Sequence, residues 1–187
     1  MSGARETLGR IVAALEAAGA RYMVVGSFAS SLHGQPRTTQ DIDLVVDASP
    51  SELESLLTSL PQSEWYVDLD AAREALRLRS MFNIIDLQSG WKADVICLRV
   101  GAFAKTEFSR RIAAELLGVR VFVATAEDTL LAKLAWARES GSDTQIEDAV
   151  GIFESVGEAL DRAYLDHWAR ELKVEVLWRR VSSGAES

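Results

Sequence analysis

The chain has 187 residues, of which 48% are hydrophobic, enough for one compact core with a helical appendage. No apolar run approaches the roughly 20 residues that span a bilayer, and residues 1–10 lack the apolar stretch of a secretory signal, so we expect a cytoplasmic protein. The net charge of −8 argues against an extended nucleic-acid-binding face. The single cysteine, Cys97, excludes an internal disulfide and a cysteine-based zinc site.

The first predicted element is an amphipathic helix whose apolar residues recur at helical spacing over residues 8–15 and which ends at Gly19. Residues 22–25 form a short, continuously apolar strand, as is typical of a strand buried on both faces. Gly26 ends that strand, and residues 28–32 begin a second helix.

The next strand covers residues 41–46, and the helix after it has a clear start signal. Ser49 is its N-cap, Pro50 lies in the first turn and Glu52 completes a capping box. Pro61 ends this helix.

The remaining strands are predicted in two neighbouring pairs, at residues 81–88 with 92–98, and 111–117 with 119–124. From Thr125 the pattern becomes helical, with further helices at 145–154 and 160–172. We therefore predict an α/β (α+β) fold, in which a mixed central sheet is flanked by helices and followed by a helical C-terminal segment. The expected divisions are a core over 1–124, a helical segment packed on it over 125–181, and a flexible tail over 182–187.

Two carboxylates, Asp41 and Asp43, mark the start of the strand at 41–46. Alternate side chains of a strand point to the same face, so the two project together. Neighbouring carboxylates repel each other unless a cation lies between them, and Mg²⁺ prefers such oxygen ligands. Upstream, Gly26-Ser27 stands where a buried strand turns into a helix, which lets a phosphate approach free backbone N–H groups.

These residues, together with His33-Gly34 and Arg37-x-Thr39, resemble the signature of the nucleotidyltransferase (polymerase-beta-like) superfamily. Within it the chain is most similar to a small bacterial branch that includes AbiEii-type toxins. The resemblance implies a nucleotidyltransferase fold, with Gly26 and Ser27 holding a triphosphate and three carboxylates holding Mg²⁺ or Mn²⁺.

The resemblance requires a third acid from a later core strand, and two candidates are present. Asp94 opens the predicted strand over residues 93–98. Asp86 lies among apolar residues in the neighbouring segment 84–87. We favour Asp94 as the third catalytic and metal-binding residue beside Asp41 and Asp43. Asp86 stays open as the alternative.

Further nucleotide contacts are expected from Arg37, Thr39 and Lys133. Lys133 follows Glu127-Asp128 in a pattern that resembles the later motif of the AbiEii-like branch, where the lysine contacts nucleotide phosphates. A solvated lysine on an amphipathic helix is the competing interpretation, and Arg37 can equally pair with an acidic side chain.

The predicted function is Mg²⁺-dependent transfer of a nucleoside monophosphate from an NTP to an acceptor hydroxyl. The acceptor is a small molecule, an RNA end or a protein. A non-catalytic nucleotide-binding module is one alternative, and a toxin–antitoxin component that acts with a protein partner chain is another.

Overall fold

The computed structural model describes residues 2–184, which form two compact units. Within that range the first unit comprises residues 2–28 and 38–123, and the second comprises residues 29–37 and 124–184. Helix α2 (Gly26–His33) continues from the first unit into the second.

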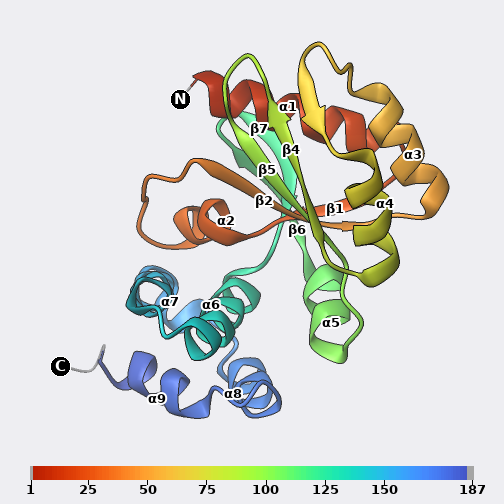
Figure 1. Ribbon diagram of the computed structural model, residues 1–187. Helices are drawn as coiled ribbons and strands as arrows, with labels where there is room; N and C mark the ends of the chain where they lie inside the picture. Colours follow the sequence, from red (N-terminus) through yellow and green to blue (C-terminus); the bar gives the residue numbers. More distant parts are fainter. Residues whose placement is uncertain (1, 185–187) are drawn as a thin grey trace. The chain divides into compact units, whose positions relative to one another are not determined.

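A seven-stranded mixed sheet forms the centre of the first unit, in the order β3-β4-β5-β2-β1-β7-β6 (Figure 1). The β2–β5 and β1–β7 pairs are parallel, and the other neighbours are antiparallel. The strands are β1 (Arg21–Val24), β2 (Asp41–Asp47), β3 (Trp65–Val67), β4 (Met81–Asp86), β5 (Lys92–Cys97), β6 (Ile112–Leu116) and β7 (Val119–Val123). This architecture confirms the predicted fold class.

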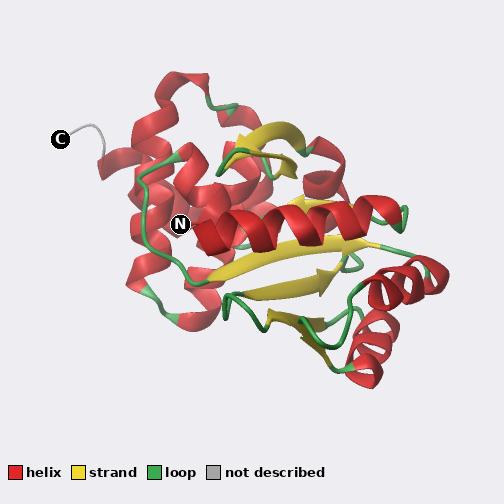
Figure 2. Cartoon of the chain, turned by 90° about the horizontal axis from the view of Figure 1, so that it is seen from above, coloured by secondary structure: helices red, strands yellow, loops and turns green. Residues whose placement is uncertain are grey.

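The helices of this unit are α1 (Ser2–Ala17), α3 (Pro50–Ser59), α4 (Leu69–Leu78) and α5 (Ala102–Arg110). Figure 2 shows α1, which starts beside the N label, lying along the strands. The capping box at Ser49 and Glu52 is present as predicted. Strand β3 and helix α4 occupy a stretch to which the sequence pattern assigned no element.

Burial alternates along the central strands and separates the two faces of the sheet. In β2, Ile42, Leu44 and Val46 are buried, whereas the residues between them are half-buried. Strand β5 repeats the pattern with Ala93, Val95 and Cys97 on its buried side. One face therefore supplies the apolar core, and the other carries side chains that reach solvent.

The second unit is helical, with α6 (Ala126–Ser140), α7 (Asp143–Val156), the 3₁₀ turn η1 (Gly157–Ala159), α8 (Arg162–Glu171) and α9 (Glu175–Gly184). Leu130, Leu131 and Leu134 of α6 are fully buried, as their spacing predicts. Residues 182–184 of the expected tail lie inside α9, and residues 185–187 lie outside the described residues. None of the helices within residues 2–184 combines the length and the apolar character needed to cross a membrane.

Candidate functional site

Three carboxylates meet on the half-buried face of the first unit's sheet. Asp43 of β2 and Asp94 of β5 are direct Cα partners in the parallel ladder, and Asp41 is the partner of Lys92 two residues earlier. Partners on adjacent strands lie about 5 Å apart with their side chains on one face. The ladder therefore brings Asp41, Asp43 and Asp94 together at the start of β2 and β5.

The ammonium group of Lys92 lies between two of these carboxylates. Its Nζ is 3.0 Å from Oδ1 and 3.1 Å from Oδ2 of Asp94, and 3.5 Å from Oδ1 of Asp41. The hydrogen bond to Asp94 raises the pKa of Lys92 above its ordinary value, and the charge of Asp41 adds to the shift. On the other side, Asn83 of β4 donates a hydrogen bond to Oδ1 of Asp94.

The carboxylate oxygens of this cluster are suitable ligands for a divalent ion, but Lys92 forms ion pairs with two of the three carboxylates. Among residues 2–184 no three His, Cys, Asp or Glu side chains are arranged to hold a metal. Hard ions such as Mg²⁺ bind carboxylate oxygens, and two of the three acids already bind the cationic Lys92 Nζ. Metal binding by this set thus requires Lys92 to release Asp41 and Asp94.

Gly26 forms a cradle for Asp43 that no other residue could form. Its φ of +64° lies in the left-handed region, and a Cβ built on it would come 2.0 Å from Oδ2 of Asp43. The preceding Val25 N–H donates to the Asp43 carbonyl at 2.9 Å. These contacts place the N-terminus of α2, which begins at Gly26 and includes the buried Ser27, directly beside Asp43. The backbone N–H groups of a helix start point along the helix axis and are suited to phosphate oxygens.

Thr39 has a local role at the start of β2. Its Oγ1 lies 3.4 Å from the N and 3.3 Å from the O of Asp41. The contact helps fix the backbone from which Asp41 projects.

The other two predicted nucleotide-binding residues, Arg37 and Lys133, meet within the second unit. Lys133 Nζ lies 2.7 Å from Oδ2 of Asp148, and Arg37 Nε lies 3.6 Å from the same oxygen. Only 7% of the Lys133 side chain is exposed, so Lys133 is not a solvated lysine. The ion pair accounts for its burial within this unit, and contact of Lys133 and Arg37 with a nucleotide stays a prediction.

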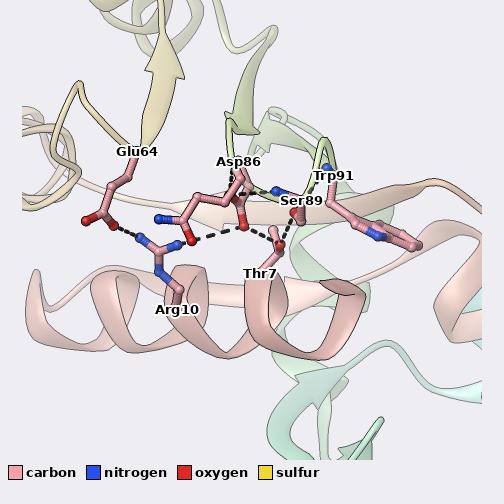
Figure 3. Close-up of polar contacts among 7 residues, drawn as sticks. Thr7, Arg10, Glu64, Asp86, Ser89 and Trp91 are labelled. Atoms are coloured by element: carbon pink, nitrogen blue, oxygen red, sulfur yellow. Dashed lines mark hydrogen bonds and ion pairs between the residues drawn. The ribbon is translucent and has the colours of Figure 1, made fainter. Parts of the chain in front are cut away.

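Asp86, the alternative third acid, points to the opposite face of the sheet (Figure 3). It is 2% exposed, and its Oδ2 accepts a 2.7 Å hydrogen bond from the Thr7 hydroxyl of α1. Burial raises its pKa, but hydrogen bonds from Thr7, Gln88 and Ser89 outweigh that effect and hold the pKa below its usual range. Asp86 therefore ties α1 to the turn after β4.

Lys92 and Asn83 are the site residues that the motif analysis missed. Lys92 was detectable, because it precedes Asp94 by two residues on one strand and must share its face. Asn83 was not, because it reaches Asp94 through the register of the β4–β5 pair, which no local signal specifies.

Comparisons with known proteins identify the fold. No protein-family model matches the chain, and no curated protein matches it in sequence. The solution structure of the antibiotic-resistance factor ANT(2'')-Ia is similar with a TM-score of 0.57 at 16% identity, covering 99% of this chain and 97% of that one. Its crystal structure with adenylyl-2''-tobramycin gives a TM-score of 0.56 at 16% identity over 96% and 97%.

An antigenic nucleotidyltransferase-like protein from Paracoccidioides brasiliensis is also similar, with a TM-score of 0.52 at 16% identity over 91% of this chain and 92% of that one. These identities are too low to transfer an activity, and they bear on architecture only. The chain has the nucleotidyltransferase fold.

Proposed function

We propose that this protein is a metal-dependent nucleotidyltransferase that transfers a nucleoside monophosphate from an NTP to an acceptor hydroxyl. The observation that carries the proposal is the pairing of Asp43 with Asp94 beside the glycine cradle at Gly26. A carboxylate cluster can hold the metal ion of a metal-bound triphosphate, and the positive end of a helix start favours its phosphate groups.

Each residue has a distinct part in this proposal. Asp41, Asp43 and Asp94 would hold Mg²⁺ or Mn²⁺, which supplies Lewis-acid polarisation of the α-phosphate. Gly26 and Ser27 would bind the triphosphate oxygens. Asp94 is preferred to Asp86, because Asp86 is committed to Thr7 on the other face of the sheet.

The reaction forms a bond between the acceptor oxygen and the α-phosphorus and breaks the bond to the β-phosphate. Asp94 would accept the proton of the acceptor hydroxyl, and pyrophosphate leaves with the negative charge. Backbone N–H groups at Gly26 and Ser27 would stabilise that charge as it develops.

Among the possible acceptors of the nucleoside monophosphate, we favour a small molecule. Two observations support it: the excess of 28 acidic over 20 basic residues, which suits a cationic acceptor, and the adenylyl-2''-tobramycin bound in the structurally similar ANT(2'')-Ia. The AbiEii-like branch and a protein partner chain stay predictions.

A non-catalytic nucleotide-binding module is the second candidate, and Lys92 favours it. The Lys92 ammonium group already pairs with Asp41 and Asp94, so part of the repulsion among the carboxylates is relieved without a metal. If a divalent ion does not displace Lys92 from Asp41 and Asp94, the protein would bind a nucleotide without transferring it.

The test is turnover of α-labelled NTPs with Mg²⁺ or Mn²⁺ and a panel of hydroxyl acceptors that includes tobramycin. We expect label transfer and pyrophosphate release by the wild type, and a loss of at least a hundredfold in Asp43→Asn and Asp94→Asn. Asp70→Asn, at a carboxylate that is 96% exposed on α4, is the matched control and should keep full activity. Metal-dependent NTP binding without turnover would favour the module, and no NTP binding at all would refute both candidates.

A further inference from the structure

A hollow lined by basic side chains lies at the other end of the first unit's sheet. Its volume is about 460 Å³, and it forms where β2 and β5 finish, where β1 starts and where α5 packs. Its basic lining residues are Arg21, Arg79, Arg99, Lys105 and Arg111. Among the described residues that line it, Asp47 is the single carboxylate.

The positive charge of this pocket contrasts with the net negative charge of the whole chain. Acidic residues outnumber basic ones by 28 to 20 over the whole sequence, whereas the ratio around this pocket is one to five. Asp47 forms an ion pair with Arg21. In the part of the chain that the structure describes, no carboxylate lies within ion-pairing distance of the other four basic side chains.

Arg111 is held rigidly at the pocket wall. Its guanidinium carbon lies 4.4 Å from the ring centre of Phe108 and 5.2 Å from that of Phe122, and its Nη1 donates a 2.6 Å hydrogen bond to the Phe108 carbonyl. Its Nε is buried and has no hydrogen-bond partner within residues 2–184. Burial lowers the pKa of Arg111, and the nearby charge of Arg21 lowers it further.

Two like charges share one aromatic ring here. The guanidinium carbon of Arg21 lies 5.9 Å from the centre of the Phe108 ring that Arg111 also covers. Repulsion between neighbouring guanidinium groups is relieved by an anion that binds both, and planar guanidinium groups match phosphate oxygens in pairs. The hollow is of the size that proteins use for small ligands.

We propose that this pocket is a binding site for a small polyphosphate group, either free or as the phosphate end of a nucleotide. It is separate from the carboxylate cluster. Asp43 and Asp47 are four residues apart on β2, which places them about 13 Å from each other along the strand. The proposal stands whether or not the chain transfers nucleotides.

The test is calorimetric titration of the full chain with inorganic triphosphate in EDTA, so that no divalent ion contributes. We expect binding to the wild type, and an affinity at least tenfold lower in Arg99→Gln/Lys105→Gln, in which both altered side chains are exposed. The matched control is Lys173→Gln/Arg179→Gln, which removes two exposed charges of the same sign from the second unit. The control should bind as the wild type does, and an equal loss in the two double variants would overturn the proposal.

Three further titrations identify the source of the phosphate, the binding site and the class of ligand. ATP that binds as tightly as triphosphate indicates the phosphate end of a nucleotide, whereas weaker ATP binding indicates free polyphosphate. Asp43→Asn should leave triphosphate binding unchanged, and its loss in that variant would place the ligand at the carboxylate cluster instead. Tight binding of a single-stranded oligonucleotide with none of triphosphate would replace the proposal with a nucleic-acid contact.

Discussion

Gly26 packs so closely against Asp43 that a Cβ atom built on the glycine would lie 2.0 Å from the Oδ2 of the carboxylate. The same glycine has a φ of +64°, so it meets two demands that only a residue without a side chain satisfies. This contact couples the helix start of α2 to the position of one carboxylate, and it leads to the first prediction.

Gly26→Ala should abolish Mg²⁺-dependent NTP binding and lower the free energy of unfolding by about 2 kcal/mol, because it adds a clash to backbone strain. Gly90→Ala is the control: its φ is +74°, but a Cβ there meets nothing within 4 Å. In that variant the free energy of unfolding should fall by about 1 kcal/mol from backbone strain, and NTP binding should be unchanged. Urea unfolding and nucleotide titration measure both effects, and equal NTP affinity in the two variants would argue against the cradle.

Lys92→Met should increase the affinity for Mn²⁺ by about three- to tenfold, because the ammonium group competes with the ion for Asp41 and Asp94. Electron paramagnetic resonance of free Mn²⁺ measures this affinity without reference to turnover. Lys173→Met, which removes an exposed lysine of the second unit, should leave it unchanged. An unaltered affinity in Lys92→Met would mean that the metal and the lysine use different oxygens.

Asp86→Asn should destabilise the chain by about 1–3 kcal/mol at pH 7, because the buried carboxylate accepts hydrogen bonds from Thr7, Gln88 and Ser89. The pKa of Asp86 is lowered in the folded state, so its stabilisation is present above the unfolded pKa of about 3.9 and is lost as the pH falls through the folded pKa. The gap between wild type and variant should therefore be constant from pH 7 to pH 5 and shrink below about pH 4.

Urea unfolding at several pH values measures that gap. Turnover offers a second contrast, because Asp86→Asn should retain it at temperatures where the variant is folded, whereas Asp94→Asn should lose it with little change in stability. Loss of turnover in a folded Asp86→Asn protein would reinstate Asp86 as a site residue.

The strands that carry the carboxylates were predictable because their signal is strong and local. Both β2 and β5 begin with alternating polar and apolar residues and continue as an apolar run that contains β-branched residues. The hairpin around Gly118 was also predictable, because a glycine between two apolar runs favours a tight turn, and Gly118 has the positive φ of 77° that such turns use. Local chemistry also specified the start of α3 at Ser49.

The elements that escaped prediction lack such signals. Helix α4 buries only Ala72 and Ala75, so it shows no stripe of large apolar side chains. The assignment of residues 29–37 to the second unit depends on contacts distant in sequence. At Gly34, for example, a Cβ would lie 2.8 Å from the backbone N of Ile152. The pairing of Asp43 with Asp94 likewise depends on strand register, so the preference for Asp94 over Asp86 came from the family resemblance and not from a local signal.

The ion pair between Lys133 and Asp148 yields a prediction that separates packing from ligand binding. The two side chains are only 7% and 10% exposed, so Lys133→Met leaves the buried Asp148 carboxylate with the more distant Arg37 and should destabilise the chain by about 3 kcal/mol. The double variant Lys133→Met/Asp148→Leu removes both charges and should recover most of that loss. A double-mutant cycle by urea unfolding measures the coupling.

Nucleotide titration of the same double variant then decides what Lys133 does besides packing. If its ammonium group only neutralises Asp148, the folded double variant should bind NTP with the wild-type affinity. If it contacts phosphate, the affinity should fall by about tenfold or more although stability is restored, because a charged hydrogen bond to phosphate has been lost. Because the comparison is made at restored stability, a fall in affinity is attributable to the lost phosphate contact and not to unfolding.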